Sequence, residues 1–426
     1  MWIVAPLAVL GTIGAGCLIY RFVVDRLVAN TSDAIKTTLA ILALTGAVLA
    51  GVYAYRKQRI AESDAHRADA NQFADRYTTV AEQLGHEKAA VRLAGVYALA
   101  RLADDWEEQR QVCIDVLCAY LRMPYQTNPG SPEYKEGERE VRHTVIRLIR
   151  DHLSLPPAHP HSWQGLDFDF TAVTFDGGDL SGATFSGGTI SFNRAEFSDG
   201  TVSFSGAAFS GGEVSFGRAT FSGGIVSFDR ATFSGGKVLF RRVSFSGGAV
   251  FFDESSFTGG EVSFDRADFS DGIVSFYQAD SSGGRLSFDR ANFSGGKVEF
   301  VGSRFVGGRV GFDQATFSSG TVTFHVGFMG AKVDFDGATF SGARVDFNWS
   351  AFSSGTVSFR GAAFPGGRVS FDQADFSGST VIFLGASFSG GTVDLQSVAS
   401  WARPPLFGTG VWGNAPAGLA LPSPSQ

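Results

Sequence analysis

The pattern of apolar and polar positions changes along the chain, and residues 1–60 contain two apolar stretches. Trp2 to Tyr20 is uncharged and ends at Arg21, and Thr37 to Tyr55 is uncharged and ends at Arg56. Each stretch has the length, roughly 20 residues, that a helix needs to cross the hydrocarbon core of a bilayer. We therefore predict two transmembrane helices that form a hairpin over residues 1–60.

Basic residues predict the orientation of this hairpin. Arg56, Lys57 and Arg59 directly follow the second apolar stretch. Lysine and arginine beside membrane helices tend to stay on the cytoplasmic side. With two crossings, the N-terminus and everything after the hairpin are then cytoplasmic, and residues 21–36 face out. We predict a multi-pass protein of the cell membrane with its soluble region in the cytoplasm.

Two alternative interpretations of the N-terminus are a cleaved signal peptide and a lipoprotein signal. A signal peptide begins with basic residues, and none precedes the first apolar stretch. The residues Gly14-Ala15-Gly16-Cys17 resemble a lipoprotein cleavage box, but Gly14 replaces the expected aliphatic residue. We interpret Cys17 as a residue of the membrane helix.

The middle of the chain is predicted to be α-helical. Glycine is rare there, and apolar residues recur at helical spacing, as in Val91, Ala94, Ala98 and Leu102. Breaks near Gly85, at 104–105 and at 124–132 separate the helices. The predicted elements are a stalk at about 60–84 and helices at 88–103, 106–122 and about 136–153. We expect a small helical bundle over residues 61–155, followed by a linker over residues 156–165.

Phenylalanine dominates the second half of the chain at a fixed period. One register recurs at every twelfth position, and a second register follows it by seven positions: Phe185, Phe197, Phe209, Phe221, Phe233, Phe245, Phe257 and Phe269, then Phe192, Phe204, Phe216, Phe228, Phe240, Phe252, Phe264 and Phe276. The pattern continues to Leu395 in about eighteen units; Ser281 replaces one Phe, and one residue is deleted between Phe324 and Phe335. A fixed period over so many units is typical of a repeat architecture.

Each block of the repeat has a small or β-branched residue two positions before Phe, as in Ala231-Thr232-Phe233. This alternation turns both side chains to one face of an extended segment, and the Gly-Gly spacers permit the positive φ of tight corners. A coil made of a single unit is too narrow for two rings, so we predict that two units form each turn, with four sides and about 24 residues. The expected product is a β-solenoid over residues 166–400 with about nine coils, about 45 Å long at about 4.8 Å per coil.

The ends of this solenoid need caps. We expect Trp163 to Phe175 to close the start and Trp401 to close the far end. The remaining tail, residues 401–426, is rich in Pro, Gly and Ala without periodicity, and we predict that it is disordered.

Composition and charge add few chemical candidates. The three cysteines, Cys17, Cys113 and Cys118, do not form a disulfide framework, which favours a reducing compartment. Cys113 and Cys118 are five positions apart on one predicted helix, with no further ligand nearby, so we interpret them as buried thiols and not as metal ligands. His159 and His161 are interpreted as ordinary exposed linker residues.

The repeat region contains His325 as its one histidine and no cysteine, and its many serines occupy repeat positions. Its glycine-rich turns recur once per unit without a following helix and lysine, so they are corners and not phosphate-binding loops. We predict that the protein is not an enzyme and that it has no catalytic, cofactor-binding or metal-binding residues and no cofactor.

Two parts of the chain resemble known families. The segment from Glu82 to Ala103, continued from Val112 to Leu121, resembles a HEAT-like helical module of many bacterial membrane proteins that carry pentapeptide repeats. That module has no assigned chemistry.

The blocks Ala195-Glu196-Phe197, Ala267-Asp268-Phe269 and Ala291-Asn292-Phe293 resemble the pentapeptide-repeat family. This resemblance implies a right-handed quadrilateral β-helix. The two-residue spacer departs from the uninterrupted five-residue rhythm of that family, so two corners of each coil are expected to be wider.

Some members of that family mimic duplex DNA and protect topoisomerases, which requires a strongly acidic surface. Residues 166–397 contain 24 Asp or Glu and 16 Lys or Arg, a net charge of only −8. Neighbouring pairs such as Asp265-Arg266 and Asp289-Arg290 predict ladders of mixed sign. We therefore expect a non-enzymatic, membrane-tethered scaffold or regulatory protein with an unidentified protein partner and no direct contact with nucleic acid. The alternative is a DNA-mimicking topoisomerase protector, and the oligomeric state stays open.

Overall fold

The computed structural model describes residues 31–408 and 415–422, together with residues 14, 17–18, 20–22, 24–25 and 411. The chain divides into two compact units, Met1–Arg76 and Tyr77–Gln426, which are described separately.

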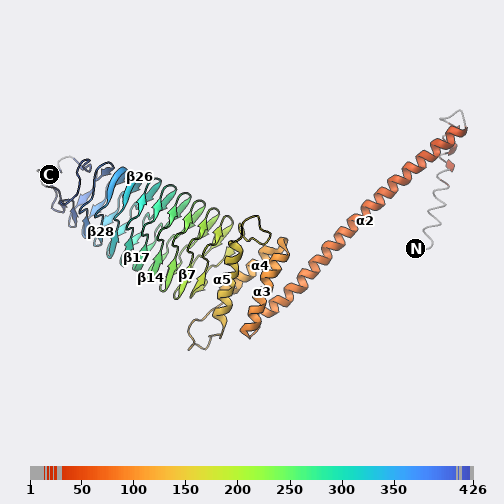
Figure 1. The fold of residues 1–426 in the computed structure, drawn as a ribbon, viewed down its shortest axis with the longest axis horizontal. Helices are drawn as coiled ribbons and strands as arrows, with labels where there is room; N and C mark the ends of the chain where they lie inside the picture. Colours follow the sequence, from red (N-terminus) through yellow and green to blue (C-terminus); the bar gives the residue numbers. More distant parts are fainter. Residues whose placement is uncertain are drawn as a thin grey trace. The chain divides into compact units, whose positions relative to one another are not determined.

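The first unit contains most of helix α2 (Thr31–Leu84), which is drawn as one continuous helix in Figure 1. Its segment Ile35–Leu84 is the one helix in the described part of the chain that is long and apolar enough to cross a membrane. Leu44, Leu49 and Tyr53 on this helix are all more than half exposed. Apolar side chains exposed in this way are compatible with contact with lipid. The other expected membrane helix, Trp2 to Tyr20, lies largely outside the described residues, so the two-helix hairpin remains a prediction.

The second unit begins with the last turns of α2 and three further α-helices, which we call the helical cap. These are α3 (Ala89–Asp105), α4 (Arg110–Arg122) and α5 (Glu138–Leu153), with a short 3₁₀ helix, η1 (Glu107–Gln109), before α4. The helices expected at 88–103, 106–122 and 136–153 are therefore confirmed to within a few residues. Val96, Leu117 and Val145, one from each α-helix, are fully buried in its core.

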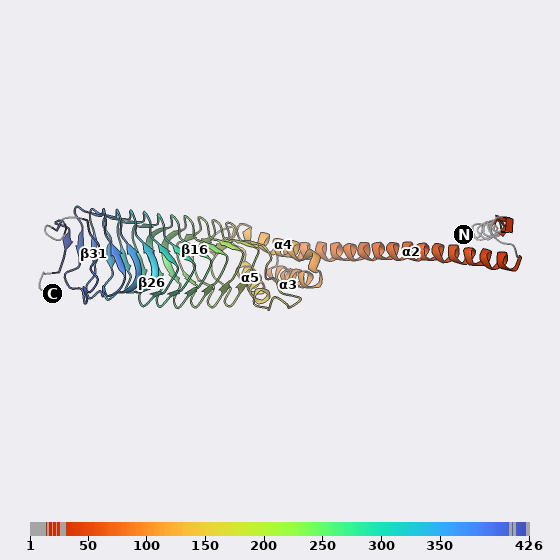
Figure 2. The same ribbon diagram turned by 90° about the horizontal axis from the view of Figure 1, so that it is seen from above.

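A β-solenoid of about ten turns follows the helical cap, one more than the nine expected, and the coils stack in regular succession in Figures 1 and 2. All its strand pairs are parallel, and in most of them a strand residue pairs with the residue 24 positions later, as Thr220 does with Ser244. In the first coil the interval can be 22, as between Phe168 and Ile190. The common interval confirms the expected length of one turn. The handedness remains a prediction from the resemblance.

The strands form four stacks, which we call sides 1 to 4 in the order in which the chain visits them. Side 1 contains β4 (Thr184–Phe185), β8 (Ala208–Phe209), β12 (Thr232–Phe233), β15 (Ser256–Phe257), β18 (Asp280–Ser281), β22 (Arg304–Phe305) and the beginnings of β26 (Gly327–Asp334) and β29 (Ala351–Ser358). Side 2 contains β1 (Phe168–Asp169), β5 (Thr189–Ser191), β9 (Glu213–Ser215), β13 (Lys237–Leu239), β16 (Glu261–Ser263), β19 (Arg285–Ser287), β23 (Arg309–Gly311), the ends of β26 and β29, and β32 (Thr380–Ile382).

Side 3 contains β2 (Thr174–Phe175), β6 (Glu196–Phe197), β10 (Thr220–Phe221), the beginnings of β14 (Ser244–Phe251) and β17 (Asp268–Ser275), β20 (Asn292–Phe293), β24 (Thr316–Phe317), β27 (Thr339–Phe340), β30 (Ala363–Phe364) and β33 (Ser387–Phe388). Side 4 contains β3 (Gly178–Asp179), β7 (Thr201–Ser203), β11 (Ile225–Ser227), the ends of β14 and β17, β21 (Lys297–Glu299), β25 (Thr321–Thr323), β28 (Arg344–Asp346), β31 (Arg368–Ser370), β34 (Thr392–Asp394) and β35 (Leu419–Ala420).

Phenylalanine rings fill the interior in columns. One column consists of Phe192, Phe216, Phe240, Phe264, Phe288, Phe312, Phe335, Phe359, Phe383 and Phe407. Successive rings in it are stacked with centroids 4.6 to 5.2 Å apart. Rings of facing columns meet edge to face, as Phe216 and Phe228 do at 5.9 Å and 80°. Both arrangements are favourable for aromatic pairs.

Two kinds of corner connect the sides. Sides 1 and 2, and sides 3 and 4, are joined through the two-residue spacers, which we call glycine corners. Sides 2 and 3, and sides 4 and 1, are joined by tight turns, which we call turn corners. In one turn corner the Ala231 N–H donates to the Phe228 carbonyl at 3.0 Å, and Arg230 between them has φ of 56°. The two-residue spacers thus fall at two of the four corners, and the greater width expected of those corners remains a prediction.

One layer of the solenoid is imperfect because Ser281 occupies a Phe position. Its hydroxyl is buried and has no hydrogen-bond partner among the described residues. The side chains around it leave a narrow void that does not admit a water molecule. Phe305, in the next coil, is tilted by 55° against Phe328, whereas most rings of this column are nearly parallel. The neighbouring ring has therefore tipped without filling the space.

The predicted one-residue deletion is confirmed and lies in a turn corner. Val298 pairs with Val322, a full period later, but Phe305 pairs with Phe328, which is one position short of a full period. The missing residue therefore falls at His325-Val326, where the turn is one residue shorter than in the other coils. The stacking of Phe324 on Phe347 continues at 4.4 Å, so the shorter corner leaves the core intact.

The ends of the solenoid differ from the prediction. Residues 156–165 are not a free linker, because the buried Arg110 on α4 donates to the carbonyls of Pro160 at 2.7 Å and Ser162 at 3.3 Å. Trp163 is fully buried, and its ring stacks on His152 at 4.0 Å. The helical cap and the solenoid consequently belong to one compact unit.

The expectation of a disordered tail also fails for residues 401–408 and 415–422. Trp401 packs edge-on against Phe376, as expected of a lid, but Phe407 also stacks on Phe383. β35 pairs with β34 through Val393 and Leu419. These residues form a partial last coil, because the exposed edge and rings of the preceding coil offer both hydrogen bonds and apolar surface.

The void at Ser281 leads to a first prediction. Replacing Ser281 by Phe should raise the free energy of unfolding by about 1–2 kcal/mol, which is less than full burial of a Phe gives because Phe305 must move back. The matched change Phe233→Ser, in the same column, should lower it by about 3–5 kcal/mol. Chemical denaturation of the full chain measures both, and a loss of stability in Ser281→Phe would contradict the stacking account.

The glycine corners lead to a second prediction. Gly236 has φ of 63°, and a Cβ there would lie 2.5 Å from the Gly212 carbonyl oxygen of the preceding coil. Gly206, at a turn corner, has φ of 66° but no atom within 4 Å of a Cβ. Gly206→Ala should therefore lower stability by about 1 kcal/mol through backbone strain alone, and Gly236→Ala by clearly more, because backbone atoms must move. Equal effects in thermal unfolding would show that contact between coils is unimportant at the glycine corner.

Candidate functional surface

The joint between the helical cap and the first coil is built around Asp176, which is nearly buried in the chain between β2 and β3. Its carboxylate accepts hydrogen bonds from Tyr125 at 2.7 Å and from Arg139 Nε at 3.0 Å, and its Oδ1 lies 3.0 Å from His143 Nε2. Arg139 also donates to the Asp176 carbonyl at 3.0 Å. One carboxylate therefore connects α5, and the loop before it, to the solenoid.

The electrostatics of this joint favour the ionised carboxylate. Burial alone would raise the pKa of Asp176, but hydrogen bonds from His143 and Tyr125 and the charges of His143 and Arg139 lower it to about 2. Burial and the hydrogen bond to Asp176 raise the pKa of the Tyr125 hydroxyl, so it stays a donor. The Asp176 carboxylate is therefore ionised at neutral pH, and both of its oxygens have hydrogen-bond partners.

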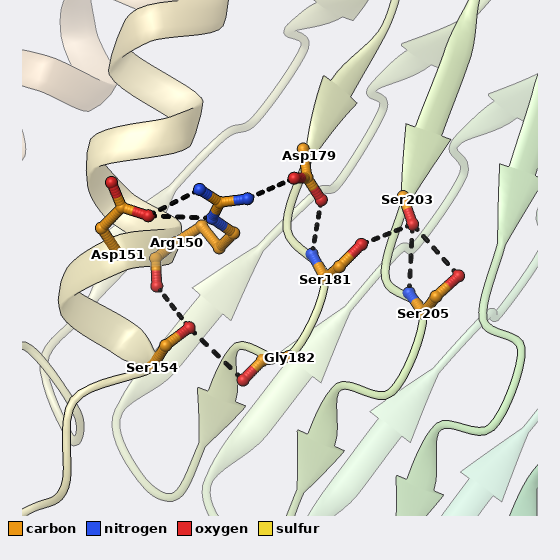
Figure 3. Close-up of polar contacts among 8 residues, drawn as sticks. All are labelled: Arg150, Asp151, Ser154, Asp179, Ser181, Gly182, Ser203 and Ser205. Atoms are coloured by element: carbon orange, nitrogen blue, oxygen red, sulfur yellow. Dashed lines mark hydrogen bonds and ion pairs between the residues drawn. The ribbon is translucent and has the colours of Figure 1, made fainter.

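Further polar contacts extend the joint along α5 (Figure 3). Arg150 forms an ion pair with Asp179 on β3, and Ser154 donates to the Gly182 carbonyl at 3.4 Å. From there a serine ladder continues between coils: Ser181 contacts Ser203 at 2.7 Å, and Ser205 contacts Ser227 at 2.7 Å. These bonds position the cap and join the first coils, and they create no reactive group.

The cysteines and histidines considered from the sequence as chemical candidates do not come together in one site. Burial raises the pKa of Cys113 to about 11 and that of Cys118 to about 12, so both thiols stay protonated at neutral pH. Cys17 is exposed on its helical turn. Within the described residues, no group of three or more His, Cys, Asp or Glu is arranged to hold a metal ion.

The histidines singled out from the sequence lie beside Asp104 or at a corner of the solenoid. His161 is half exposed, with its Nδ1 3.7 Å from Asp104, while His152, which the sequence analysis did not single out, lies 3.2 Å from the same carboxylate. Asp104 also lies 3.4 Å from Trp163 Nε1. His159 packs edge to face against His161 at 5.4 Å. His325 lies 3.5 Å from Asp346 at the shortened corner.

Charged residues form the expected mixed-sign ladders in part of the outer surface: Glu213, Lys237, Glu261 and Arg285 pair in successive coils of side 2, and Arg230 lies 3.0 Å from Glu254 of the next coil. One turn corner instead carries a ladder of like charge. At the corner between sides 2 and 3, Arg194, Arg218, Arg242, Arg266 and Arg290 occupy the same positive-φ position in five successive coils. We call this edge the arginine corner. One position earlier, Asp265, Asp289 and Asp313 stack in the same way. Burial and the nearby Asp289, Asp334 and Asp336 raise the pKa of Asp313.

The like-charge ladder was not predicted because the expectation compared neighbours in sequence, whereas neighbours on the surface of a solenoid are one coil apart. The spacing of these arginines by one full turn is readable in the sequence, so the signal was present. At the joint, Asp176 stands out because the same position in the following coils is Ser, as in Ser198 and Ser222, but its partners could not be predicted because they depend on which helix face abuts the first coil.

Comparison with known proteins supports the repeat assignment. Residues 170–220 match the family model described as pentapeptide repeats, in 9 copies. No curated protein and no solved structure gives a match to this chain. The matched residues lie in the first coils, and with the observed fold they show a β-solenoid built on pentapeptide repeats. The HEAT-like resemblance of the helical cap and the membrane anchor remain predictions.

The Asp176 joint leads to a third prediction. Asp176→Asn should destabilise the docking of the helical cap by about 1–3 kcal/mol, because Arg139 and His143 lose their charged partner. The pKa of Asp176 is lowered in the folded chain, so its contribution is complete above the unfolded value near 4 and is lost as the pH falls towards 2.

Hydrogen exchange of α5 amides across this pH range measures the effect. Asp372→Asn, an exposed carboxylate far along the solenoid, is the control and should leave α5 protection unchanged. If α5 in the Asp176→Asn chain retained wild-type protection at neutral pH, the joint would not depend on this carboxylate.

Proposed function

We propose that this chain is a non-enzymatic, membrane-tethered scaffold that presents its solenoid to a partner protein. The observation that carries the proposal is the arrangement of each coil: the inward positions are filled by stacked rings, and the outward positions carry residues that vary from coil to coil. Such a rod provides a stiff, regular surface that can bind without reactive groups.

The absence of an assembled chemical site within the described residues is compatible with a binding role and does not test it. The apolar, exposed segment of α2 supports a membrane tether. If the basic residues after it stay inside, the solenoid faces the cytoplasm.

Exposed side chains offer contact points on the solenoid. Trp349 occupies a positive-φ corner position and is 70% exposed. A large aromatic residue is unexpected at such a position, where equivalent coils have Arg, Glu, Gln, Gly or His, and aromatic residues are enriched at binding hot spots. The backbone does not require it there, so its presence supports a binding role for this corner.

The proposal leads to a fourth prediction. A photo-crosslinking amino acid at Trp349 or at Arg218 of the full chain, expressed in its native cell, should link to one and the same protein. The same group at Arg101, an exposed position on α3, is the matched control and should not. The linked chain should remain in the membrane fraction after high-salt washing.

The outcomes separate the alternatives. Recovery of a topoisomerase would favour the DNA-mimicking protector instead. Release of the chain from membranes by salt would contradict the integral tether. Absence of any protein crosslink from several outward positions would contradict the scaffold.

A further inference from the structure

The arginine corner lies beside a long groove along the solenoid. Its first part, of about 580 Å³, extends from Thr171 to Arg242, and its second part, of about 360 Å³, extends from Arg241 to Arg290. Arg241 and Arg242 line both parts, so the groove is continuous across about five coils. Serines and small residues such as Ser215, Gly217 and Ser263 form much of its floor.

Seven arginines line this groove. Arg241 and Arg285 form ion pairs with Glu261 at 3.7 Å and Asp289 at 2.7 Å, whereas four of those at the arginine corner have no internal partner in the described part of the chain. Among the described residues, Arg194, Arg218, Arg242 and Arg266 have no carboxylate within 4 Å and no side-chain hydrogen bond, although each is exposed. Arg290, in the fifth coil, lies 3.3 Å from Asp265. Four successive coils, about 4.8 Å apart, thus present four uncompensated guanidinium groups in a row.

The fold does not require arginine at this position. The backbone there has φ between 55° and 59°, a conformation that glycine adopts without strain and that side chains with a Cβ disfavour. Later coils have Gly337, Gly361 and Gly385 at the same corner position. Arginine at this position therefore costs both backbone strain and repulsion between neighbouring guanidinium groups. Its presence despite these costs indicates that the arginines bind an external anion.

The charge pattern selects the kind of anion. Glu213, Glu261 and Asp289 also line the groove, and the chain as a whole has a net charge of −7. A uniform polyanion such as nucleic acid would be repelled by these carboxylates, and the groove offers no aromatic ring for bases to stack on. A protein segment can place carboxylates opposite the arginines alone, where guanidinium groups bind them in bidentate fashion.

The spacing between coils indicates which conformation the bound protein segment has. One turn of an α-helix advances about 5.4 Å, close to the separation of about 4.8 Å between coils, whereas same-side residues of an extended chain are about 6.6 Å apart. We propose that the arginine groove binds a helical segment of the partner protein that presents one acidic side chain per turn. This inference rests on the proposed function, because it assumes that the partner is a protein.

The test measures binding of a fluorescent helical peptide with Glu at one position per turn to the full chain in nanodiscs of neutral lipid. A peptide of the same composition with its Glu residues distributed around the helix is the ligand control. Arg218→Gly with Arg242→Gly should weaken binding at least tenfold, because glycine preserves the corner and only the charges are lost. Arg230→Gly, at the opposite turn corner with φ of 56°, is the matched variant and should change binding less than twofold.

Equal binding of the two peptides, or an unchanged affinity in the double variant, would overturn the inference. Tighter binding of a single-stranded oligonucleotide than of the acidic peptide would also overturn it. The double arginine variant could bind the peptide normally while the crosslinker at Trp349 still captured a protein. That result would contradict the arginine groove as the binding site and would still support the proposed scaffold function. If no protein were captured and no peptide bound, both would fail.

Discussion

Ring stacking between successive coils is the interaction on which the rest of the second unit depends. The rings stack at about the spacing of parallel strands, so each coil must place its Phe residues over those of the coil below, usually 24 positions later and 23 positions later across the shortened corner at His325. Each stacked pair adds about 0.5–1.5 kcal/mol to the burial of the rings themselves. This constraint explains the alternation before each Phe, the glycine corners and the close tolerance at Gly236, where a single methyl group has no room.

Because the stacked rings of the interior stabilise the solenoid, the residues at outward positions can vary without disrupting it. This freedom explains why one turn corner can carry Arg in five coils and Gln or Gly in later ones, and why Trp349 can occupy another. Carboxylates at the corners do have structural tasks: Asp289 accepts the backbone N–H of Asp313 at 3.1 Å from the next coil. Arg194, Arg218 and Arg242 make no comparable bond with their side chains among the described residues, so their role is to be sought outside the chain.

The sequence predicted the solenoid, its period, both irregular coils and the helix boundaries, because these follow from local alternation and from breaks such as Gly85. It did not predict the joint at Asp176: this residue stands where the following coils have Ser, as in Ser198 and Ser222, but its partners come from α5 and the loop before it. The last partial coil was overlooked although a signal existed: Phe407 follows Phe383 by one period, and only the Pro-rich residues between them interrupt the pattern. The stacking of the arginines was missed because sequence neighbours were compared in place of coil neighbours.

The imperfect layer at Ser281 divides the solenoid into two parts that we expect to differ in stability. Contacts in such a fold are made only between adjacent coils, so cooperativity is weakest where one layer is poorly filled. Partial melting would then separate the coils beyond Ser281, together with their capping tail, from those beside the helical cap. The half that survives would contain Arg194 to Arg266, so a heat-damaged or clipped molecule would keep the four unpaired arginines while losing the last part of the groove, which Arg285 and Arg290 line.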